Sequence, residues 1–323
     1  MRILFLRRCE KAVILPERKD VHAMELRHVL GNTWVAEANT ALLPVCKITE
    51  KDIVLIDTGY AKLDRSGLTA MIEDNGFHLR GVICSHAHFD HSGNVRYLQQ
   101  RCGARAAAHI IEAGISVNPD AYRANYVALT YGKSREYFLE ECFTADAIIG
   151  PEDEYLDFCG VRFGILPLPG HSAGHIGVVT PDNVAYVGDC LLDQQQIDSA
   201  KLPTSMFIAR DLQSKAFLRQ TDYPAYIIAH KAVVTDKTEL DALVDSNSEF
   251  IHRKADELLE DLADGMTFSQ WIAAFCQRES IRTKNEFKFS IIERNFANFV
   301  DWLTDEGRVT VQREYCAKTY YHG

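Results

Sequence analysis

The chain has 323 residues, a formal net charge of −10 and 47% hydrophobic residues. This length predicts one large domain and a smaller one, and the acidic balance disfavours nucleic acid as a partner because it repels phosphate backbones. No stretch approaches the roughly 18 apolar residues of a membrane span, and Arg7 and Arg8 interrupt the apolar run at the N-terminus before it reaches the length of a signal-peptide core.

The nine cysteines are scattered along the chain and include no Cys-x-x-Cys pair. In a chain of this size, such cysteines are typical of reduced, mostly buried side chains rather than of a disulfide framework. We therefore expect a cytoplasmic protein whose core comes from its length.

The first third of the chain predicts alternating strands and helices. Short β-type runs between Thr33 and Asp57 predict a strand meander. Hydrophobic periodicity then predicts, in order, a helix over 67–77, a strand over 81–85, a helix over 94–101 and a strand over 104–110. This order is typical of α/β layering.

Residues 118–146 interrupt that order with aromatic and charged residues at helical spacing on either side of Gly132. Two interpretations remain open for this segment. It is either a helical insertion that covers a site or a surface helical pair that covers a sheet edge.

Strands resume between 154 and 188, with a hairpin turn at Pro181-Asp182-Asn183. A helix near 211–220 and a strand over 225–230 complete a predicted domain of residues 1–240. Residues 241–323 predict helices, the last ending at Gly307, and then a hairpin. This order predicts a small winged-helix-like domain.

The segment Ser85-His86-Ala87-His88-Phe89-Asp90-His91-Ser92-Gly93 follows a strongly apolar strand and holds three of the chain's 12 histidines. Imidazole and carboxylate are the ligands that divalent cations such as zinc accept. A tight turn after a buried strand can aim these groups at one point. The spacing therefore favours a metal site over a polar turn with accidental histidines.

Three further candidate ligands each follow the end of a predicted strand: His171, Asp189 and His230. Binding groups collect at such strand ends in layered sheets. Each residue alone has an ordinary structural explanation. Together with the histidine turn, they supply what a site for two metal ions still lacks.

The segments SHAHFDHSG, PGHSAGH, GDC and IIAH, preceded by IDTG, resemble the metallo-β-lactamase superfamily and, within it, the glyoxalase II-like hydrolases. They span residues 53–230 in the family's order. The resemblance implies an α/β fold, a four-layer αββα sandwich, to which the helical insertion 118–146 and the winged-helix-like tail are added.

The resemblance also implies a role for each matching residue. The first metal would be bound by His86, His88 and His171, the second by Asp90, His91 and His230, and both by a bridging Asp189. Asp57 matches a buried residue that orients the ligands, and His175 matches a position that packs beside the site.

The resemblance excludes one branch of the superfamily, and the chain departs from the group's pattern at one position. The oxygen-reducing flavo-di-iron branch has Glu where this chain has His88, whereas persulfide dioxygenases share the motif with a single iron and remain an alternative. The last ligand lies in Ala229-His230-Lys231 instead of the Pro-Gly-His-Gly that is common in this group. Lys231 is either solvated or a contact for an anionic substrate.

Two divalent ions about 3.5–4 Å apart lower the pKa of a bridging water, and the resulting hydroxide attacks an electrophilic carbon or phosphorus. Zinc is the first choice, and iron and manganese tolerate the same ligands. Asp90 is a candidate to position the hydroxide, and Tyr126 and Tyr131 are candidate general acids. There is no Gly-x-Ser-x-Gly motif, and Cys190 is expected to face the core.

Two substrate classes compete: a small ester, thioester or lactone, and a phosphodiester, since some superfamily members with winged-helix-like tails are ribonucleases. Residues 240–323 carry ten Lys and Arg against fifteen Asp and Glu, a net charge of −5. A nucleic-acid-binding wing is normally basic. We therefore expect a small-molecule substrate and no membrane partner, with the small domain as a pocket wall or a homodimer contact.

Overall fold

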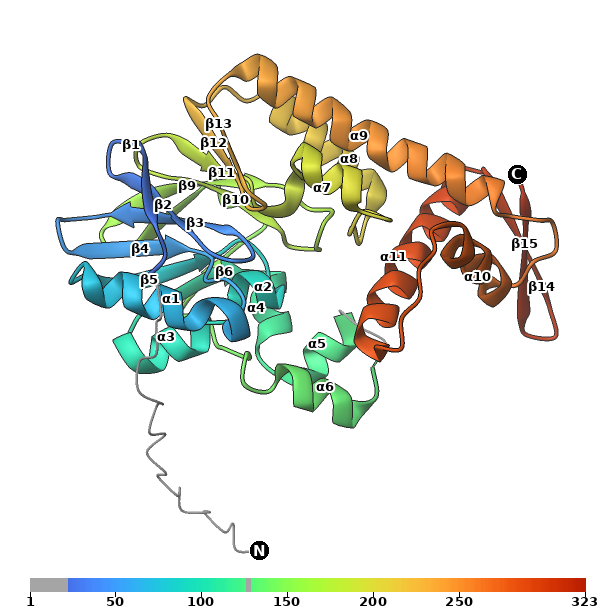
Figure 1. Cartoon of the computed structure of the whole chain (residues 1–323), viewed down its shortest axis with the longest axis horizontal. Coiled ribbons are helices and arrows are strands. Elements are labelled where there is room, and N and C mark those ends of the chain that lie inside the picture. The colour runs from blue at the N-terminus through green and yellow to red at the C-terminus, as the bar shows by residue number, and fades with distance from the viewer. Residues whose placement is uncertain (1–22, 126–128) are drawn as a thin grey trace, which may run out of the picture.

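The computed structural model describes residues 23–125 and 129–323, and its centre is a pair of β-sheets that lie face to face (Figure 1). The first sheet has its seven strands in sequence order: β1 (Leu26–Leu30), β2 (Thr33–Glu37), β3 (Leu42–Lys47), β4 (Asp52–Ile56), β5 (His78–Cys84), β6 (Arg105–His109) and β7 (Ala147–Ile149). Strands β1 to β4 pair antiparallel, and β4 to β7 pair parallel.

The second sheet contains six strands in the order β13-β12-β11-β10-β9-β8. Their bounds are β8 (Tyr155–Phe158), β9 (Val161–Pro167), β10 (Ile176–Val179), β11 (Val184–Tyr186), β12 (Ala225–Ile228) and β13 (Ala232–Val234). Strands β10 and β11 pair antiparallel across the predicted turn at 181–183. The predicted hairpin is therefore confirmed.

Side chains that alternate between the two faces of the second sheet contribute to two separate hydrophobic cores. Val184 and Tyr186 of β11 point into the core between the sheets, whereas Ala185 packs against the outer helices. This follows from the two-residue period of a strand, which sends successive side chains to opposite faces. The outer core also contains Leu218 and Leu240 from the helices that cover the second sheet.

Helices α1 (Ala61–Asp74) and α3 (Val95–Cys102) lie outside the first sheet, and α8 (Ile208–Arg219) and α9 (Lys237–Glu260) lie outside the second (Figure 1). The predicted four-layer αββα arrangement is thus confirmed. Shorter helices occupy the loops: α2 (Phe89–Ser92), α4 (Ile110–Ser116), α5 (Pro119–Asn125), α6 (Tyr131–Phe138) and α7 (Gln194–Ser199).

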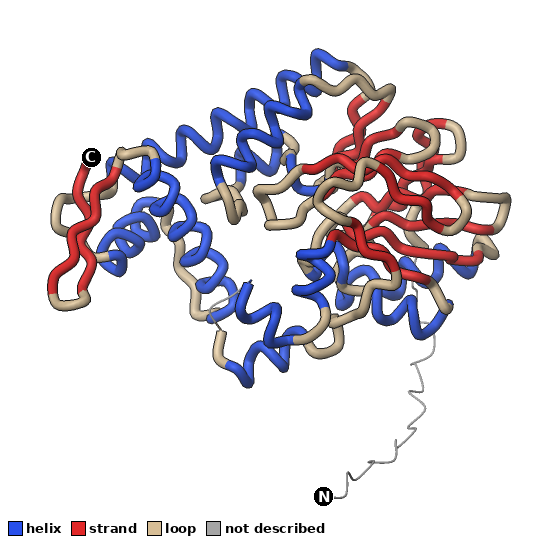
Figure 2. The backbone as a smooth tube through the Cα atoms, turned by 180° about the vertical axis from the view of Figure 1, so that it is seen from behind, coloured by secondary structure: helices blue, strands red, loops and turns tan. Residues whose placement is uncertain are grey.

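The C-terminal unit consists of α10 (Phe268–Arg278), α11 (Glu286–Asp305) and the hairpin of β14 (Val309–Glu314) and β15 (Ala317–His322). It has a core of its own, built around Trp271, Phe275 and Phe296. Figure 2 shows the strands of the two sheets gathered at one end of the molecule and this unit at the other. Helix α11 ends just before Gly307, as predicted. Its likeness to a winged helix stays a prediction.

Three details differ from the predicted elements. Helix α1 begins at Ala61 rather than at 67. The prediction missed its first turn because that turn is polar and lacks the apolar period; in the structure, Asp64 stabilises the turn by accepting a hydrogen bond from the Tyr60 N–H. Gly132 lies in the first turn of α6 rather than between two helices. Helix α9 runs unbroken through 240, so the expected domain boundary falls within a continuous helix.

No helix in the described part of the chain is both long enough and apolar enough to cross a membrane.

Candidate metal centre

The histidine turn begins where β5 ends, in the middle of the first sheet. The last four residues of β5 are fully buried between β4 and β6, so the chain leaves the sheet at a fixed point. Thr58 anchors the following turn, since both its N–H and its hydroxyl donate to the His91 carbonyl, at 2.6 and 2.9 Å. The short helix α2 then presents Asp90 and His91 toward the centre.

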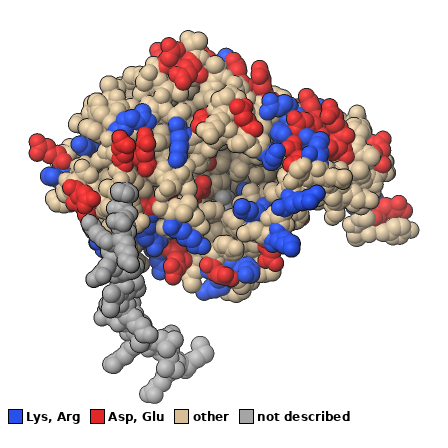
Figure 3. Space-filling view, viewed as in Figure 1, with Lys and Arg blue, Asp and Glu red and all other residues tan. Residues whose placement is uncertain are grey.

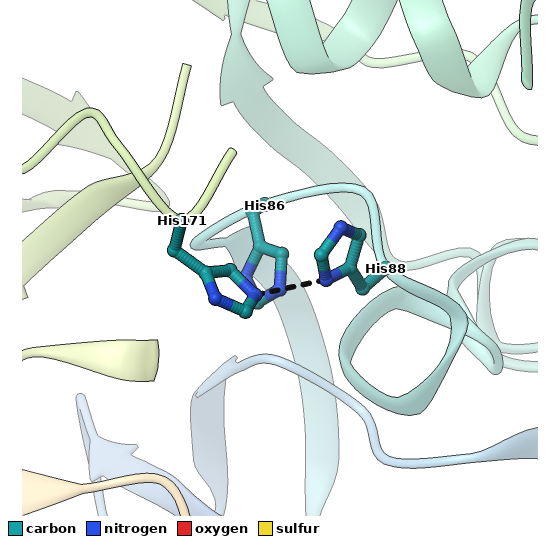
Figure 4. A group of neighbouring side chains, drawn as sticks. All are labelled: His86, His88 and His171. Carbon is teal, nitrogen blue, oxygen red and sulfur yellow. Dashed lines mark hydrogen bonds between the residues drawn. The ribbon is translucent and has the colours of Figure 1, made fainter. Parts of the chain in front are cut away.

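His86, His88 and His171 form the first group of potential ligands, and one ring nitrogen of each lies within 4.8 Å of the others. Figure 4 shows the three imidazoles converging on one point from two separate loops. His171 Nε2 lies 2.9 Å from His88 Nδ1. Two ligands of a tetrahedral zinc ion, each about 2.0–2.1 Å from the metal, are about 3.3 Å apart, so this spacing suits a cation.

Asp90, His91 and His230 form a second group within the same limit. Asp189 lies between the groups. Its Oδ1 is 3.2 Å from His91 Nε2 and 3.3 Å from His230 Nε2, and its Oδ2 is 3.3 Å from His171 Nε2. The structure therefore brings all seven expected ligands into one centre with the aspartate in the middle.

The outer nitrogen of four imidazoles is held by the protein. The Nδ1 of His171 donates to the Thr204 carbonyl (2.9 Å), that of His230 to the Thr40 carbonyl (2.7 Å) and that of His91 to the Asp57 carboxylate (2.8 Å). The Nδ1 of His86 lies 3.0 Å from the Ser85 hydroxyl. Such bonds fix the ring and leave Nε2 to face a metal.

The charges of the site also fit a cation. Burial lowers the pKa of His86 and His88 well below the usual range and that of His171 to about 3, so these rings are neutral and ready to coordinate. Burial opposes the charged forms of His91 and His230, but nearby carboxylates together outweigh it. Asp189 and Asp57 raise the pKa of His91, and Asp189, with a smaller contribution from Asp90, brings that of His230 to about 8. Divalent cations can replace the protons that otherwise balance Asp189.

His86 Nε2 gives a further test of fit. This atom is buried and has no hydrogen-bond partner among the described residues. A buried polar atom without a partner is costly unless it has another function. The seven side chains therefore fit divalent cations of the kind that accept imidazole and carboxylate ligands.

Asp57 lies behind the site and joins the strand ends. Its carboxylate accepts from the Ser85 N–H (2.8 Å), the Ser85 hydroxyl (2.6 Å) and the Tyr186 hydroxyl (2.7 Å), in addition to His91. Its backbone adopts a φ of 60°, which is uncommon for an aspartate and marks a constrained turn. Tyr186 was not foreseen, because nothing in its apolar strand distinguishes it from a core residue.

His175 supports the backbone of Asp189. Its Nδ1 donates to the Leu168 carbonyl (3.1 Å), and its Nε2 accepts from the Asp189 N–H (3.1 Å). Gly188 has a φ of 53°, and a Cβ there would lie 2.5 Å from His175 Nε2. The glycine therefore allows the close approach that holds Asp189 in place.

Glu112 was also missed by the sequence analysis. This buried carboxylate on α4 accepts from the Ala87 N–H (2.8 Å), the Ser172 hydroxyl (2.8 Å) and the Gly174 N–H (2.7 Å). It thus ties the loop of His86 and His88 to the loop of His171. Its only sign in the sequence is one acidic residue after two isoleucines, a weak signal.

The C-terminal unit reaches the centre through α11. Asn295 donates to the Thr204 hydroxyl (3.3 Å) and Asn298 to the Ser205 carbonyl (2.7 Å), and the Thr204 carbonyl holds His171. Phe287 packs against Phe89 of the histidine turn at 5.4 Å between ring centres. This unit therefore helps to shape the site.

A pocket of about 350 Å³ opens over the centre, and Figure 3 shows a hollow in the middle of this face with Lys and Arg side chains along its edge beside the C-terminal helices. Its apolar walls come from Leu202, Phe250, Ile251 and Ile291. An ion pair of Lys215 and Asp211 on α8 also lines it.

The remaining candidates are less central. Cys190 is buried in the outer core and also borders the pocket, and burial raises its pKa to about 12. Lys231 is exposed. Tyr131 is 56% exposed at the start of α6 and is not part of the pocket wall, and Tyr126 lies outside the described residues. All eight described cysteines are free thiols.

The αββα sandwich thus carries, at one edge of its sheets, a cluster of seven histidine and aspartate side chains that fits divalent cations. The model of the metallo-beta-lactamase superfamily matches residues 38–231. The chain belongs to this superfamily.

Three curated proteins that the chain resembles are named as hydroxyacylglutathione hydrolases. Hydroxyacylglutathione hydrolase GloC of Haemophilus influenzae is 30% identical over 145 residues, which are 44% of this chain and 62% of that protein. A hydroxyacylglutathione hydrolase of Ectopseudomonas mendocina is 28% identical over 40% of this chain and 39% of that protein. The match therefore spans less than two thirds of each relative.

Solved structures share the fold at low identity. A metallo-beta-lactamase family protein from Thermus thermophilus is 18% identical with a TM-score of 0.67, covering 88% of this chain and 94% of that one. A beta-lactamase domain protein from Burkholderia ambifaria is 14% identical with a TM-score of 0.69, covering 95% and 97%. Their coverage extends the likeness of fold into the C-terminal unit.

Proposed function

We propose that the protein is a two-metal hydrolase that cleaves a small ester, thioester or lactone. The observation that carries the proposal is Asp189, a buried carboxylate 3.2–3.3 Å from three imidazole nitrogens of two ligand groups. In this proposal His86, His88 and His171 bind the first ion, Asp90, His91 and His230 bind the second, and Asp189 bridges them. Zinc is the first choice, with iron or manganese as alternatives.

When bound, the two cations supply Lewis acidity, which lowers the pKa of water toward neutrality and polarises a substrate oxygen. The chain's own residues position the reactants. Asp90 lines the pocket and is partly exposed, so its carboxylate is available to orient a water. The apolar walls bind the carbon skeleton of the substrate and exclude bulk water, and a volume of about 350 Å³ suits a small molecule.

The choice of a carbonyl substrate rests on two observations. The curated relatives are named for hydrolysis of an acyl derivative of glutathione. Residues 240–323 carry a net charge of −5, which opposes a phosphodiester backbone. A ribonuclease is the second candidate, because the C-terminal unit consists of helices followed by a hairpin, an order expected for the winged-helix-like tails of some ribonucleases in the superfamily. A mononuclear-iron persulfide dioxygenase is the third.

A salt titration separates the first two candidates. With metal-loaded protein and a panel of esters, thioesters, lactones and phosphodiesters, we expect carbonyl cleavage that is nearly indifferent to salt between about 50 and 200 mM, since a small ligand releases few counterions. Metal-dependent RNA cleavage whose binding weakens by orders of magnitude over this range would instead establish the nuclease. Arg308, Arg313 and Lys318 would then be the first residues to mutate.

Metal content tests the number of ions. We expect two ions per chain at full activity, and we expect His230→Ala to lower the content toward one, because His230 belongs only to the second group. Elemental analysis of the wild type and the variant checks this. One ion at full activity together with a harmless His230→Ala would contradict the two-metal proposal and favour the dioxygenase. The expected cytoplasmic location and homodimer stay predictions.

A further inference from the structure

The pocket contains a buried ion pair that the proposed metal chemistry does not use. Lys215 and Asp211 lie one turn apart on α8, and their Nζ and Oδ1 atoms are 2.5 Å apart. Each side chain is only 5% exposed, yet both line the pocket that also contains Asp189 and Thr204. A buried ion pair is costly to desolvate and contributes little to stability, so its presence in a pocket suggests a function.

Most of the hydrogen-bonding capacity of this pair is unused. An ammonium group has three donors and a carboxylate about four acceptor sites. Within residues 23–125 and 129–323, the Lys215 ammonium donates to Asp211 alone, and the Asp211 carboxylate accepts from Lys215 alone. The free donors and acceptors therefore remain for something that enters the pocket.

Two other buried charged groups of the protein, Asp64 and Lys254, are better satisfied. The Asp64 carboxylate accepts from the N–H and amide of Asn39, the Thr40 hydroxyl and the Tyr60 N–H. The buried Lys254 ammonium contacts two carboxylates, those of Glu257 and Glu279. Neither Asp64 nor Lys254 lines the pocket. The unsatisfied pair is thus found where a ligand can reach it.

The position of the pair relative to the metal centre is fixed by backbone packing. The Ser214 hydroxyl donates to the Pro169 carbonyl at 2.7 Å. A Cβ at Gly170 would lie 2.3 Å from the Asp211 Cα, so α8 rests directly on the turn that leads to His171. A substrate held by the pair is therefore held at a constant distance from the metal ligands, as catalysis requires.

The chemistry of the pair indicates which group it binds. Together the two side chains have no net charge and present N–H donors beside carboxylate acceptors. A carboxylate on the substrate would be repelled by Asp211, and an alkyl group would leave both side chains without new partners when it displaces water. A neutral group that both accepts and donates hydrogen bonds, such as a primary amide or a hydroxyl, satisfies both.

We propose that Lys215 and Asp211 form a specificity subsite that binds an uncharged amide or hydroxyl group of the substrate. The amide is the better match, because its carbonyl can accept from Lys215 while its N–H donates to Asp211. This subsite rests on the proposed function and narrows its substrate class to carbonyl compounds with such a group.

Matched substrates test the subsite. Two series of substrates are used, each with three esters and three thioesters. Within a series the compounds share one skeleton and differ in the end group: a primary amide, the isosteric isopropyl group or a carboxylate. The end group is on the acyl side in the first series and on the leaving-group side in the second. With metal-loaded full-length protein, we expect the amide to exceed both others in kcat/KM by about 10- to 100-fold in one of the series.

The key variant is the double substitution Lys215→Met with Asp211→Leu, which replaces both partners by apolar groups of similar size and so leaves no unpaired charge. We expect it to fold and to lose the amide preference, because KM for the amide substrate rises to that of the isopropyl substrate. The matched control is Lys254→Met with Glu257→Leu and Glu279→Leu, which removes the ion pairs of the buried Lys254 away from the pocket, leaves Arg278 paired with Asp261 and should keep the preference.

The outcomes are distinct. A wild type that treats the three end groups alike or favours the carboxylate, or a double variant that keeps the amide preference, overturns the subsite. If none of these substrates and no lactone is hydrolysed, the proposed function fails, and calorimetry with the amide and isopropyl products of both series then tests the pair by itself. Tighter binding of an amide product by the wild type than by the double variant supports the subsite, and equal binding overturns it.

Discussion

Replacing Asp189 with alanine is expected to abolish hydrolysis and to lower the content of both metal ions. The carboxylate lies 3.2–3.3 Å from the Nε2 atoms of His91, His171 and His230, so its loss affects both groups of ligands at once. Substitutions that remove only a supporting residue cost about 10–100-fold in affinity or activity, so losing the bridging group should cost more than about 100-fold. Elemental analysis and kcat/KM on the best ester or thioester measure both effects.

The fold should survive this substitution. The Asp189 N–H is held by His175, and the neighbouring strand pairing does not involve its side chain. Circular dichroism should therefore match the wild type. Asp198→Ala, which removes an exposed carboxylate from nearby α7, is the control and should leave activity and metal content unchanged. Near-normal turnover of Asp189→Ala with both ions in place would refute the bridging assignment.

The sequence predicted the site best where the candidate ligands lie close together along the chain. The turn from His86 to His91 places four candidate ligands within six residues, and the strand before it is apolar throughout. His171, Asp189 and His230 were foreseen because each follows a strand end. The alternation of strands and helices followed from local hydrophobic periods, whereas the four-layer sandwich followed from the resemblance to the superfamily.

The residues that support the centre could not be foreseen in this way. Tyr186 contacts Asp57 across 129 positions, and Asn295 contacts Thr204 across 91. Such contacts depend on how the sheets and the C-terminal unit pack, and local patterns do not report packing. The pairing of Lys215 with Asp211 has helical spacing, but nothing in the sequence shows that it is buried beside a pocket.

The role of α11 connects the two parts of the chain. From its acidic sequence, the small domain was expected to be a pocket wall or a homodimer contact. Ile291 lines the pocket, and Asn295 and Asn298 hold the loop whose Thr204 carbonyl orients His171. A unit with its own core around Trp271 thus contributes to the wall of the site and, through one loop, to the orientation of His171, a proposed metal ligand.

Glu112 is the supporting residue whose loss should be most damaging. Its Oε2 accepts from the Ala87 N–H, and its Oε1 accepts from the Ser172 hydroxyl and the Gly174 N–H. Glu112→Ala leaves these three buried donors without a partner. At about 1–3 kcal/mol for each of the three unsatisfied groups, we expect a loss of roughly 3–9 kcal/mol in the free energy of unfolding, with both ligand loops loosened.

Glu112→Gln distinguishes the support that Glu112 gives to each of the two loops. If the amide oxygen keeps the contacts of Oε1 to Ser172 and Gly174, its NH₂ group faces the Ala87 N–H, donor against donor. We therefore expect the His86–His88 loop to loosen while the His171 loop stays anchored, with metal affinity reduced by about 10–100-fold and a smaller loss of stability than in Glu112→Ala. Denaturant unfolding and metal titration of both variants measure this. If Glu112→Gln binds metal like the wild type, or if Glu112→Ala unfolds at the wild-type denaturant concentration, Glu112 does not hold the two ligand loops together.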